Sequence, residues 1–192
     1  MTDIHFQGYS EEQIREGCFR GDRRFQQMLY DMFSSKMFGV CMRYANEYNA
    51  AQDLLQEGFV KVFRNIDKFR GEGSFEGWVR RIFVNTAIEH YRKQVNLYAL
   101  VDNDAKAYEN YDSNALETLK EQDIVKMIQK LSHGYRTVFN LYVVEGYSHK
   151  EIADALQITE STSRSNLVKA RIKLKEFFFA RRMEFGMDEE DK

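Results

Sequence analysis

Residues 147–171 have the sequence YSHKEIADALQITESTSRSNLVKAR, which predicts two helices joined by a short turn. Ser148 and Glu151 are spaced as in a capping box, a pair of side chains that satisfies two backbone N–H groups at the start of a helix. The apolar residues of this first helix fall on one face, as expected for a helix that packs on a core: Ile152, Ala153 and Leu156.

Basic side chains mark the second helix of this pair. Gln157 and Ile158 form the turn, and Thr159 is placed to cap the helix that follows. Leu167 and Ala170 would face inward, and the residues on the opposite side would face solvent: Arg164, Ser165, Lys169 and Arg171. A basic helix after a turn is typical of a helix that lies in the major groove of DNA, although two surface helices of an ordinary bundle would show a similar pattern.

The composition favours an all-α protein. Proline is absent, and glycines separate long segments with helical periodicity, in a chain of 192 residues that is long enough for two small domains. Cys18 and Cys41 are expected to be reduced and buried, and the spacing of Cys and His predicts no metal site and no cofactor. No apolar run approaches the roughly 20 residues that span a membrane, and no signal-peptide pattern is present, so we expect a cytoplasmic protein.

The net charge of -2 is unevenly distributed. Residues 114–182 carry 12 basic and 8 acidic side chains, whereas residues 96–113 and 183–192 are acidic. The basic excess lies on the segment that holds the helix pair, where contacts with phosphates would require it.

Charge and periodicity divide the chain into a helical domain (1–95), a flexible acidic linker (96–113), a second helical domain (114–182) and an acidic tail (183–192). Four helices are expected in the first domain: after Ser10, from Asp22 to about Tyr44, from about Ala50 to Phe69, and from about Phe75 to Val95. The second domain would add helices over about 114–131 and 134–145 before the helix pair. The tail fits a disordered end, with a role in partner binding as the alternative.

The third predicted helix has an unusual outer face. Four residues at helical spacing form a patch with two carboxylates, one amide and one aliphatic side chain: Asp53, Gln56, Glu57 and Val60. Such a patch suits a basic partner helix, but a merely solvated face has the same spacing.

Basic and aromatic side chains alternate in the segment 70–93. It begins with a glycine-containing loop and continues as a helix with Trp78, Arg80, Arg81, Asn85, Tyr91, Arg92 and Lys93. Guanidinium groups neutralise phosphates and rings stack on unpaired bases, so the mixture fits single-stranded nucleic acid. Trp78, Ile82 and Phe83 could equally be core residues.

Three motifs together resemble the extracytoplasmic-function (ECF) group of bacterial RNA polymerase sigma factors. The first is DLLQEGFVKVF (53–63) with DKF (67–69), the second GSFEGWVRRI (73–82) with Asn85 and Arg92, and the third YRTVF (135–139) with the helix pair. The resemblance covers nearly the whole chain. It implies a four-helix region 2 domain and a helix-turn-helix region 4 domain.

The resemblance also implies partners and site residues. Core RNA polymerase would be bound through the coiled coil of its largest subunit by Asp53, Gln56, Glu57 and Val60, and through the flap of its second-largest subunit. Single-stranded minus-ten DNA would be held by Arg70, Ser74, Phe75, Trp78, Arg80, Arg81, Asn85 and Arg92, with a flipped base in the loop 70–75. Double-stranded minus-thirty-five DNA would be read by Thr162, Arg164, Ser165, Val168, Lys169 and Arg171. An anti-sigma factor is a further expected partner.

The chain departs from the family pattern at three places. Gln157 stands where the turn usually has glycine, and Ser163 where an apolar residue often packs inside. Trp78 is the only tryptophan, where primary sigma factors use an aromatic pair, which suggests weaker promoter melting.

Two other classes of protein explain the sequence less well. A helix-turn-helix regulator that is not a polymerase subunit would leave the motifs at 53–69 and 73–92 unexplained. A recombinase needs a nucleophilic serine with clustered arginines, or metal-binding carboxylates, and neither is identifiable. His133 and His149 are expected to be polar surface residues. We therefore expect a protein that is not an enzyme.

Overall fold

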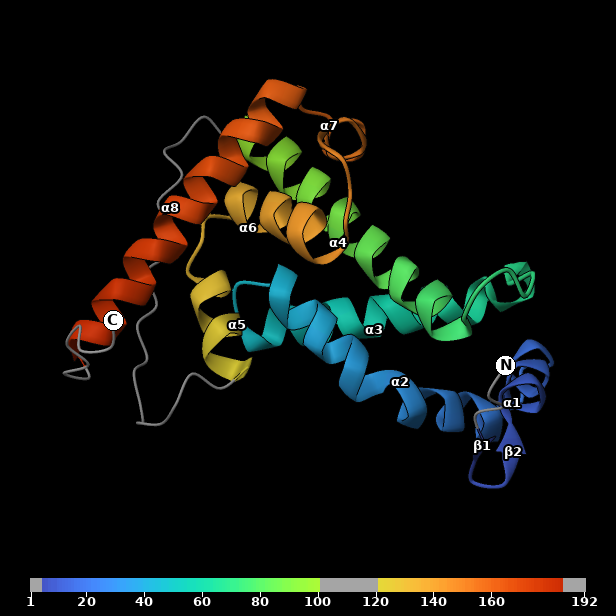
Figure 1. Ribbon diagram of the computed structural model, residues 1–192. Helices are drawn as coiled ribbons and strands as arrows, with labels where there is room; N and C mark the ends of the chain where they lie inside the picture. Colours follow the sequence, from blue (N-terminus) through green and yellow to red (C-terminus); the bar gives the residue numbers. More distant parts are fainter. Residues whose placement is uncertain (1–4, 101–120, 185–192) are drawn as a thin grey trace. The chain divides into compact units, whose positions relative to one another are not determined.

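The computed structural model describes residues 5–100 and 121–184 (Figure 1). The chain divides into two compact units, Met1–Ala87 and Ile88–Lys192. Helices dominate both units, which confirms the predicted all-α class. Most of the predicted linker and acidic tail lies outside the described residues, and the domain boundaries expected from the sequence remain predictions.

A short hairpin precedes the first helix. Strands β1 (His5–Phe6) and β2 (Tyr9–Ser10) pair in antiparallel fashion. Gln7 and Gly8 connect them with φ angles of 52° and 84°, the positive values that a tight two-residue hairpin turn of type I′ requires. This hairpin was not predicted, because two-residue strands are too short to show alternation.

The first two helices start where the sequence predicts. Ser10 forms a capping box with Gln13 at the start of α1 (Glu11–Phe19). Asp22 caps α2 (Arg23–Tyr44) by accepting a hydrogen bond of 2.8 Å from the Arg24 N–H. Both starts are therefore set by local side-chain chemistry.

The third and fourth helices differ from the prediction at their ends. Helix α3 (Tyr48–Arg64) stops at Asn65, whose side chain donates to the Lys61 carbonyl at 2.8 Å, and a short 3₁₀ turn, η1 (Ile66–Lys68), follows. Helix α4 (Phe75–Leu100) continues five residues past the predicted end at Val95. The first residues of the predicted linker are therefore helical. These residues contain no glycine, no proline and no acidic side chain that would end the helix, and the predicted end at Val95 relied on the acidity and weak helical periodicity of the segment 96–113 as a whole.

Aromatic side chains fill the core of the first unit. Phe33 and Phe75 are almost fully buried with their ring centroids 5.8 Å apart, and Phe59 meets Phe83 edge to face at 5.3 Å. Gly58 lies beneath the Phe83 ring, where a β-carbon would come within 2.2 Å of a ring carbon. The Phe83 ring of α4 can therefore lie against α3 only because residue 58 has no side chain.

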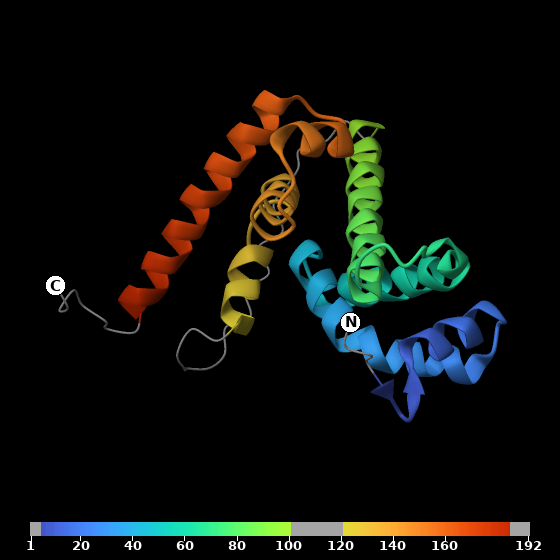
Figure 2. The same cartoon turned by 45° about the vertical axis from the view of Figure 1, so that its right-hand side comes forward.

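The second unit holds the helix pair. Its described elements are α5 (Glu121–Gln129), α6 (His133–Phe139), the π-helical segment η2 (Asn140–Val144), α7 (His149–Leu156) and α8 (Glu160–Glu184). The single helix predicted over 134–145 thus changes from α to π geometry at Asn140, and residues 114–120 lie outside the described part. Both α6 and α7 pack against the N-terminal half of the long α8 (Figures 1 and 2).

Buried apolar residues from three helices contribute to the core of this unit. They come from α6, α7 and α8 and include Val138, Ile152, Leu156, Leu167 and Ala170. The five residues of the helix pair that were predicted to face inward are all buried: Ile152, Ala153, Leu156, Leu167 and Ala170. The predicted amphipathic faces are confirmed.

Gly58→Ala should destabilise the first unit. The added methyl group would displace Phe83 from a close-packed core, so we expect the free energy of unfolding to fall by about 1–3 kcal/mol. Trp78, the only tryptophan, lies in this unit, and urea denaturation followed by its fluorescence measures the change.

Gly39→Ala on α2 is the matched control. A β-carbon there meets nothing within 4 Å, so stability should stay the same or rise by up to about 1 kcal/mol from helix propensity. Equal destabilisation by the two substitutions would contradict the packing argument.

Candidate nucleic-acid interface

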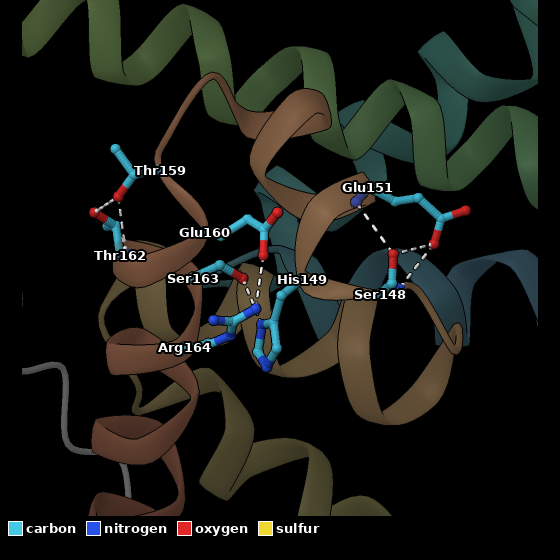
Figure 3. A network of polar contacts seen from close by, with 8 residues as sticks. All are labelled: Ser148, His149, Glu151, Thr159, Glu160, Thr162, Ser163 and Arg164. Carbon is cyan, nitrogen blue, oxygen red and sulfur yellow. Dashed lines mark hydrogen bonds and ion pairs between the residues drawn. The ribbon is translucent and has the colours of Figure 1, made fainter.

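A capping box starts the first helix of the pair, as predicted. The Ser148 N–H donates to the Glu151 carboxylate at 2.8 Å, and the Glu151 N–H donates to the Ser148 hydroxyl at 3.2 Å (Figure 3). These bonds fix the first residue of α7 and therefore the direction in which α7 enters the unit.

The turn between the helices places Gln157 in the left-handed region, with φ 57° and ψ 44°. The N–H of Ile158 bonds back to the Ala153 carbonyl at 3.1 Å, which closes the end of α7. Glycine adopts this conformation without steric cost, whereas glutamine does not. The departure noted in the sequence therefore falls on the one residue of the turn that needs a positive φ.

Thr159 caps the second helix, also as predicted. Its hydroxyl accepts a hydrogen bond of 3.0 Å from the Thr162 N–H and lies 2.8 Å from the Thr162 hydroxyl (Figure 3). All six residues expected to meet minus-thirty-five DNA are exposed: Thr162, Arg164, Ser165, Val168, Lys169 and Arg171. Helix α8 thus presents one continuous polar and basic face with an exposed valine in it.

Two of the basic side chains on this face interact with neighbouring side chains. The Arg164 guanidinium forms a 2.6 Å ion pair with Glu160 one turn earlier, and the Lys169 ammonium lies 6.0 Å from the centre of the Tyr135 ring. Exposed ion pairs contribute only about 0–1 kcal/mol, so Arg164 can exchange Glu160 for another partner at little cost.

The histidines are not the surface residues that the sequence predicted. His149 is half-buried, with its ring stacked on Tyr142 at a centroid distance of 4.5 Å. His133 is also half-buried and packs against Tyr91 at 4.9 Å. Burial, aided by the positive charge of Arg136 and by His90, lowers the pKa of His133 to about 4, so this side chain is neutral at pH 7.

The outer face of α3 is placed as predicted. Asp53, Gln56 and Val60 are exposed, and Val60 retains 46% of its accessible surface. Glu57 is half-buried and forms a 2.9 Å ion pair with Lys61, a residue that the sequence analysis did not include. The i, i+4 spacing of this pair was visible in the sequence. The opposite face is core, since Leu55, Phe59, Val62 and Ile66 are buried.

The loop before α4 combines exposed polar residues with a buried ring. Arg70 and Ser74 are exposed, and the Ser74 hydroxyl accepts a hydrogen bond of 3.1 Å from the Gly77 N–H. Phe75 is only 2% exposed and stacks on Trp78 at 5.6 Å. Phe75 is therefore a core residue that anchors the loop, and its ring is not available at the surface.

The remaining residues assigned to minus-ten DNA spread along α4. Arg81 and Asn85 are exposed, and Arg80 is half-buried. Arg92 belongs to the second unit, where its Nε donates to the Ala155 carbonyl near the end of α7 at 2.6 Å. A cation at the C-terminal end of a helix also interacts favourably with the helix dipole.

Thiol chemistry, metal binding and membrane insertion each require features that the described residues lack. Cys18 and Cys41 are free and buried, as predicted, and burial raises the pKa of each thiol to about 12. Within 5–100 and 121–184, no group of His, Cys, Asp or Glu is arranged to hold a metal ion. No helix in these ranges has the length and hydropathy needed to cross a bilayer.

A capped helix-turn-helix with a basic exposed face places the chain among DNA-binding proteins. Comparison with known families agrees: the sigma-70 region 2 model matches residues 29–96, and the sigma-70 region 4 model matches residues 121–174.

Individual relatives cover most of the chain. It is 30% identical over 173 residues to the RNA polymerase sigma-H factor of Pseudomonas aeruginosa, covering 84% of this chain and 90% of that protein. It is 29% identical over 174 residues to the ECF RNA polymerase sigma-E factor of Haemophilus influenzae, covering 84% and 92%. The chain belongs to the RNA polymerase sigma factors of the ECF group. This confirms the resemblance seen in the sequence. The alternative class, a helix-turn-helix regulator that is not a polymerase subunit, is not supported.

A solved structure supports the same fold. The sigma factor RpoE, in complex with the anti-sigma factor NepR from Bartonella quintana, superposes with a TM-score of 0.51 at 20% sequence identity, covering 79% of this chain and 95% of that one.

Gln157→Gly should stabilise the second unit. Glycine removes the steric cost of the left-handed conformation, so we expect the free energy of opening of α7 and α8 to rise by about 1 kcal/mol. Amide hydrogen exchange of the two helices measures it. Gln157→Ala, which keeps a β-carbon at the same φ, should give no increase, and an equal gain from alanine would contradict the conformational explanation.

Proposed function

We propose that this sigma factor divides promoter recognition between a region 2 domain over residues 1–95 and a region 4 domain over residues 114–182. The observation that carries the proposal is the exposed basic face of α8, presented by a capped turn and backed by buried Leu167 and Ala170. A protein of this kind acts by bringing core polymerase to promoters and holding displaced bases, without catalysis of its own.

Helix α8 is proposed to read minus-thirty-five DNA from the major groove. Arg164 offers a guanidinium that can bond the two acceptors of a guanine edge, and Val168 can meet a thymine methyl group. Ser165 can serve several bases or a phosphate, while Thr162, Lys169 and Arg171 would contact the backbone. The exposure of all six side chains supports these roles.

The loop 70–75 and α4 are proposed to hold single-stranded minus-ten DNA. Exposed Arg70, Ser74, Arg81 and Asn85 would contact the strand, together with Arg80 and Arg92. Trp78, half-buried beside the loop, offers an aromatic surface for an unstacked base. Phe75 contributes from inside, because its buried ring fixes the start of α4 under the loop.

Core polymerase is the proposed partner of the α3 face formed by Asp53, Gln56, Glu57 and Val60. An exposed aliphatic side chain beside carboxylates suits a basic amphipathic helix, as in the coiled coil of the largest subunit. The region 4 domain would bind the flap of the second-largest subunit. An anti-sigma factor is also proposed, because the similar RpoE structure contains one, and the cytoplasm is the compartment in which these partners meet.

Reconstituted transcription tests the proposal as a whole. The purified chain, mixed with core RNA polymerase and promoter DNA but no other sigma factor, should start RNA synthesis at a defined site. A positive control with another sigma factor establishes that the core enzyme is active. Absence of specific starts in parallel with a working control would refute the proposal.

Gln56→Ala combined with Glu57→Ala should weaken binding to core polymerase by about tenfold or more while thermal stability is retained. Gln56 is exposed and Glu57 is half-buried on the outer face of α3, so their loss should remove contacts with the partner and leave the buried face of the helix intact. Affinity is measured by competition against the wild-type chain for core enzyme.

The matched control is Gln27→Ala with Asp31→Ala. These two residues also pair an amide with a carboxylate on an exposed helix face, but on α2, and should leave polymerase binding unchanged. Loss of thermal stability in the α3 double variant would instead mean that its face belongs to the core.

Arg164→Ala should relax base preference at one position of the minus-thirty-five element, costing about 1–3 kcal/mol with the preferred base pair and less with the others. A panel of duplexes that vary one base pair at a time measures this. Lys175→Ala, an exposed cation further along α8, should leave the preference pattern unchanged. A uniform loss across the panel for Arg164→Ala would assign Arg164 to phosphate contact.

A further inference from the structure

Ser163 is a polar residue in a position that packs inside. It lies on the inner face of α8 with Leu167 and Ala170 and is 0% exposed. A buried hydroxyl without a partner would cost free energy, so its environment has to supply a hydrogen bond. His149 supplies it: Nδ1 lies 2.9 Å from the Ser163 hydroxyl (Figure 3).

The histidine is itself held from two sides. It is the first residue of α7, directly after Ser148, whose capping box fixes the backbone at this point. Its ring stacks on Tyr142 of η2 with an interplanar angle of 25° and a centroid distance of 4.5 Å. The hydrogen bond to Ser163 therefore joins α8 to a side chain whose own position is already determined by two other elements.

This bond constrains α8 in a way that apolar packing does not. Contacts of Leu167 and Ala170 with the core are non-directional and tolerate a small rotation of the helix about its axis. A hydrogen bond weakens steeply when its angle or length changes. Because successive residues of a helix are separated by about 100°, fixing the direction of Ser163 also fixes the direction of Arg164 and Thr162 on either side of it.

We propose that the His149–Ser163 hydrogen bond sets the rotation of α8 and thereby determines how sharply the minus-thirty-five bases are discriminated. The proposal rests on the proposed reading of DNA by α8. His149 and Ser163 are positioning residues in this account, since both act through Arg164 and its neighbours and touch no base themselves.

The prediction separates discrimination from general DNA affinity. Removal of the hydrogen bond leaves every cation of α8 in place, so affinity for unrelated duplex DNA should change by less than about twofold. Misdirected base-reading side chains should reduce the ratio of specific to unrelated affinity by about tenfold. A purely structural role would lower stability and leave this ratio unchanged for the folded protein.

Three variants of the full chain test the proposal. His149→Leu removes the bond and leaves Ser163 buried without its partner. His149→Leu with Ser163→Val replaces both partners by apolar groups, which is often nearly neutral for stability. His149→Asn keeps a polar atom close to the place of Nδ1 and should restore most of the discrimination. Affinities for a selected minus-thirty-five duplex and an unrelated duplex are measured at one salt concentration, well below the melting temperature.

A double-mutant cycle with Arg164 connects the pair to base reading. If His149 acts by directing Arg164, then Arg164→Ala should reduce discrimination much less in the His149→Leu background than in the wild-type background. Additive effects of the two substitutions would overturn the proposal.

The remaining outcomes are also decisive. If the wild-type chain itself does not discriminate between the duplexes, the proposed reading by α8 fails. If the wild-type chain discriminates, and the folded His149→Leu variant and the His149→Leu, Ser163→Val double variant discriminate as well as the wild type, only the positioning role fails. Unfolding of both of these variants would show that the pair is needed for folding, and would likewise overturn the proposal.

Discussion

The arrangement of the second unit depends on one turn. Residues Gln157 to Thr159 connect α7 to α8 so that the apolar faces of the two helices meet, with Ile152 and Leu167 both buried. The connection is short because α7 ends on a residue in the left-handed region, and glutamine occupies that position with φ 57°. The burial of the two faces compensates a local conformational cost of about 1–2 kcal/mol. This packing also determines the exposed face of α8. Because residues on a helix have fixed relative directions, burying Leu167 and Ala170 leaves the residues on the opposite side exposed.

Local signals in the sequence predicted the starts of helices well. Ser10, Asp22, Ser148 and Thr159 each cap the helix that the spacing assigns to them, since a cap needs only neighbours within three residues. Ends were less predictable. The last turns of α4 beyond Val95 and the change to π geometry at Asn140 carry no stop signal such as glycine or proline, and they depend on packing that one sequence does not reveal.

In the candidate site, too, local patterns were predictable from the sequence and long-range packing was not. Exposure of the α8 residues followed from helical periodicity, because the inner face was identified by Leu167 and Ala170. Burial of Phe75 did not follow, since the motif that contains it does not distinguish a ring that meets a base from a ring that supports the loop. The partly buried positions of His149 and His133 were also missed. Each arises from contacts with a residue at least seven positions away, Tyr142 for His149 and Tyr91 for His133.

The ion pair between Arg164 and Glu160 has a consequence for electrostatics. In the free protein this guanidinium is already partly neutralised by a carboxylate of its own helix. Transfer to a guanine edge, as proposed above, would exchange one partner for another and would leave Glu160 without its cation, beside a negatively charged duplex. In the proposed contact, Arg164 would therefore add direction more than net attraction. A base pair that offers no acceptor would gain nothing from Arg164, because the guanidinium can keep its contact with Glu160.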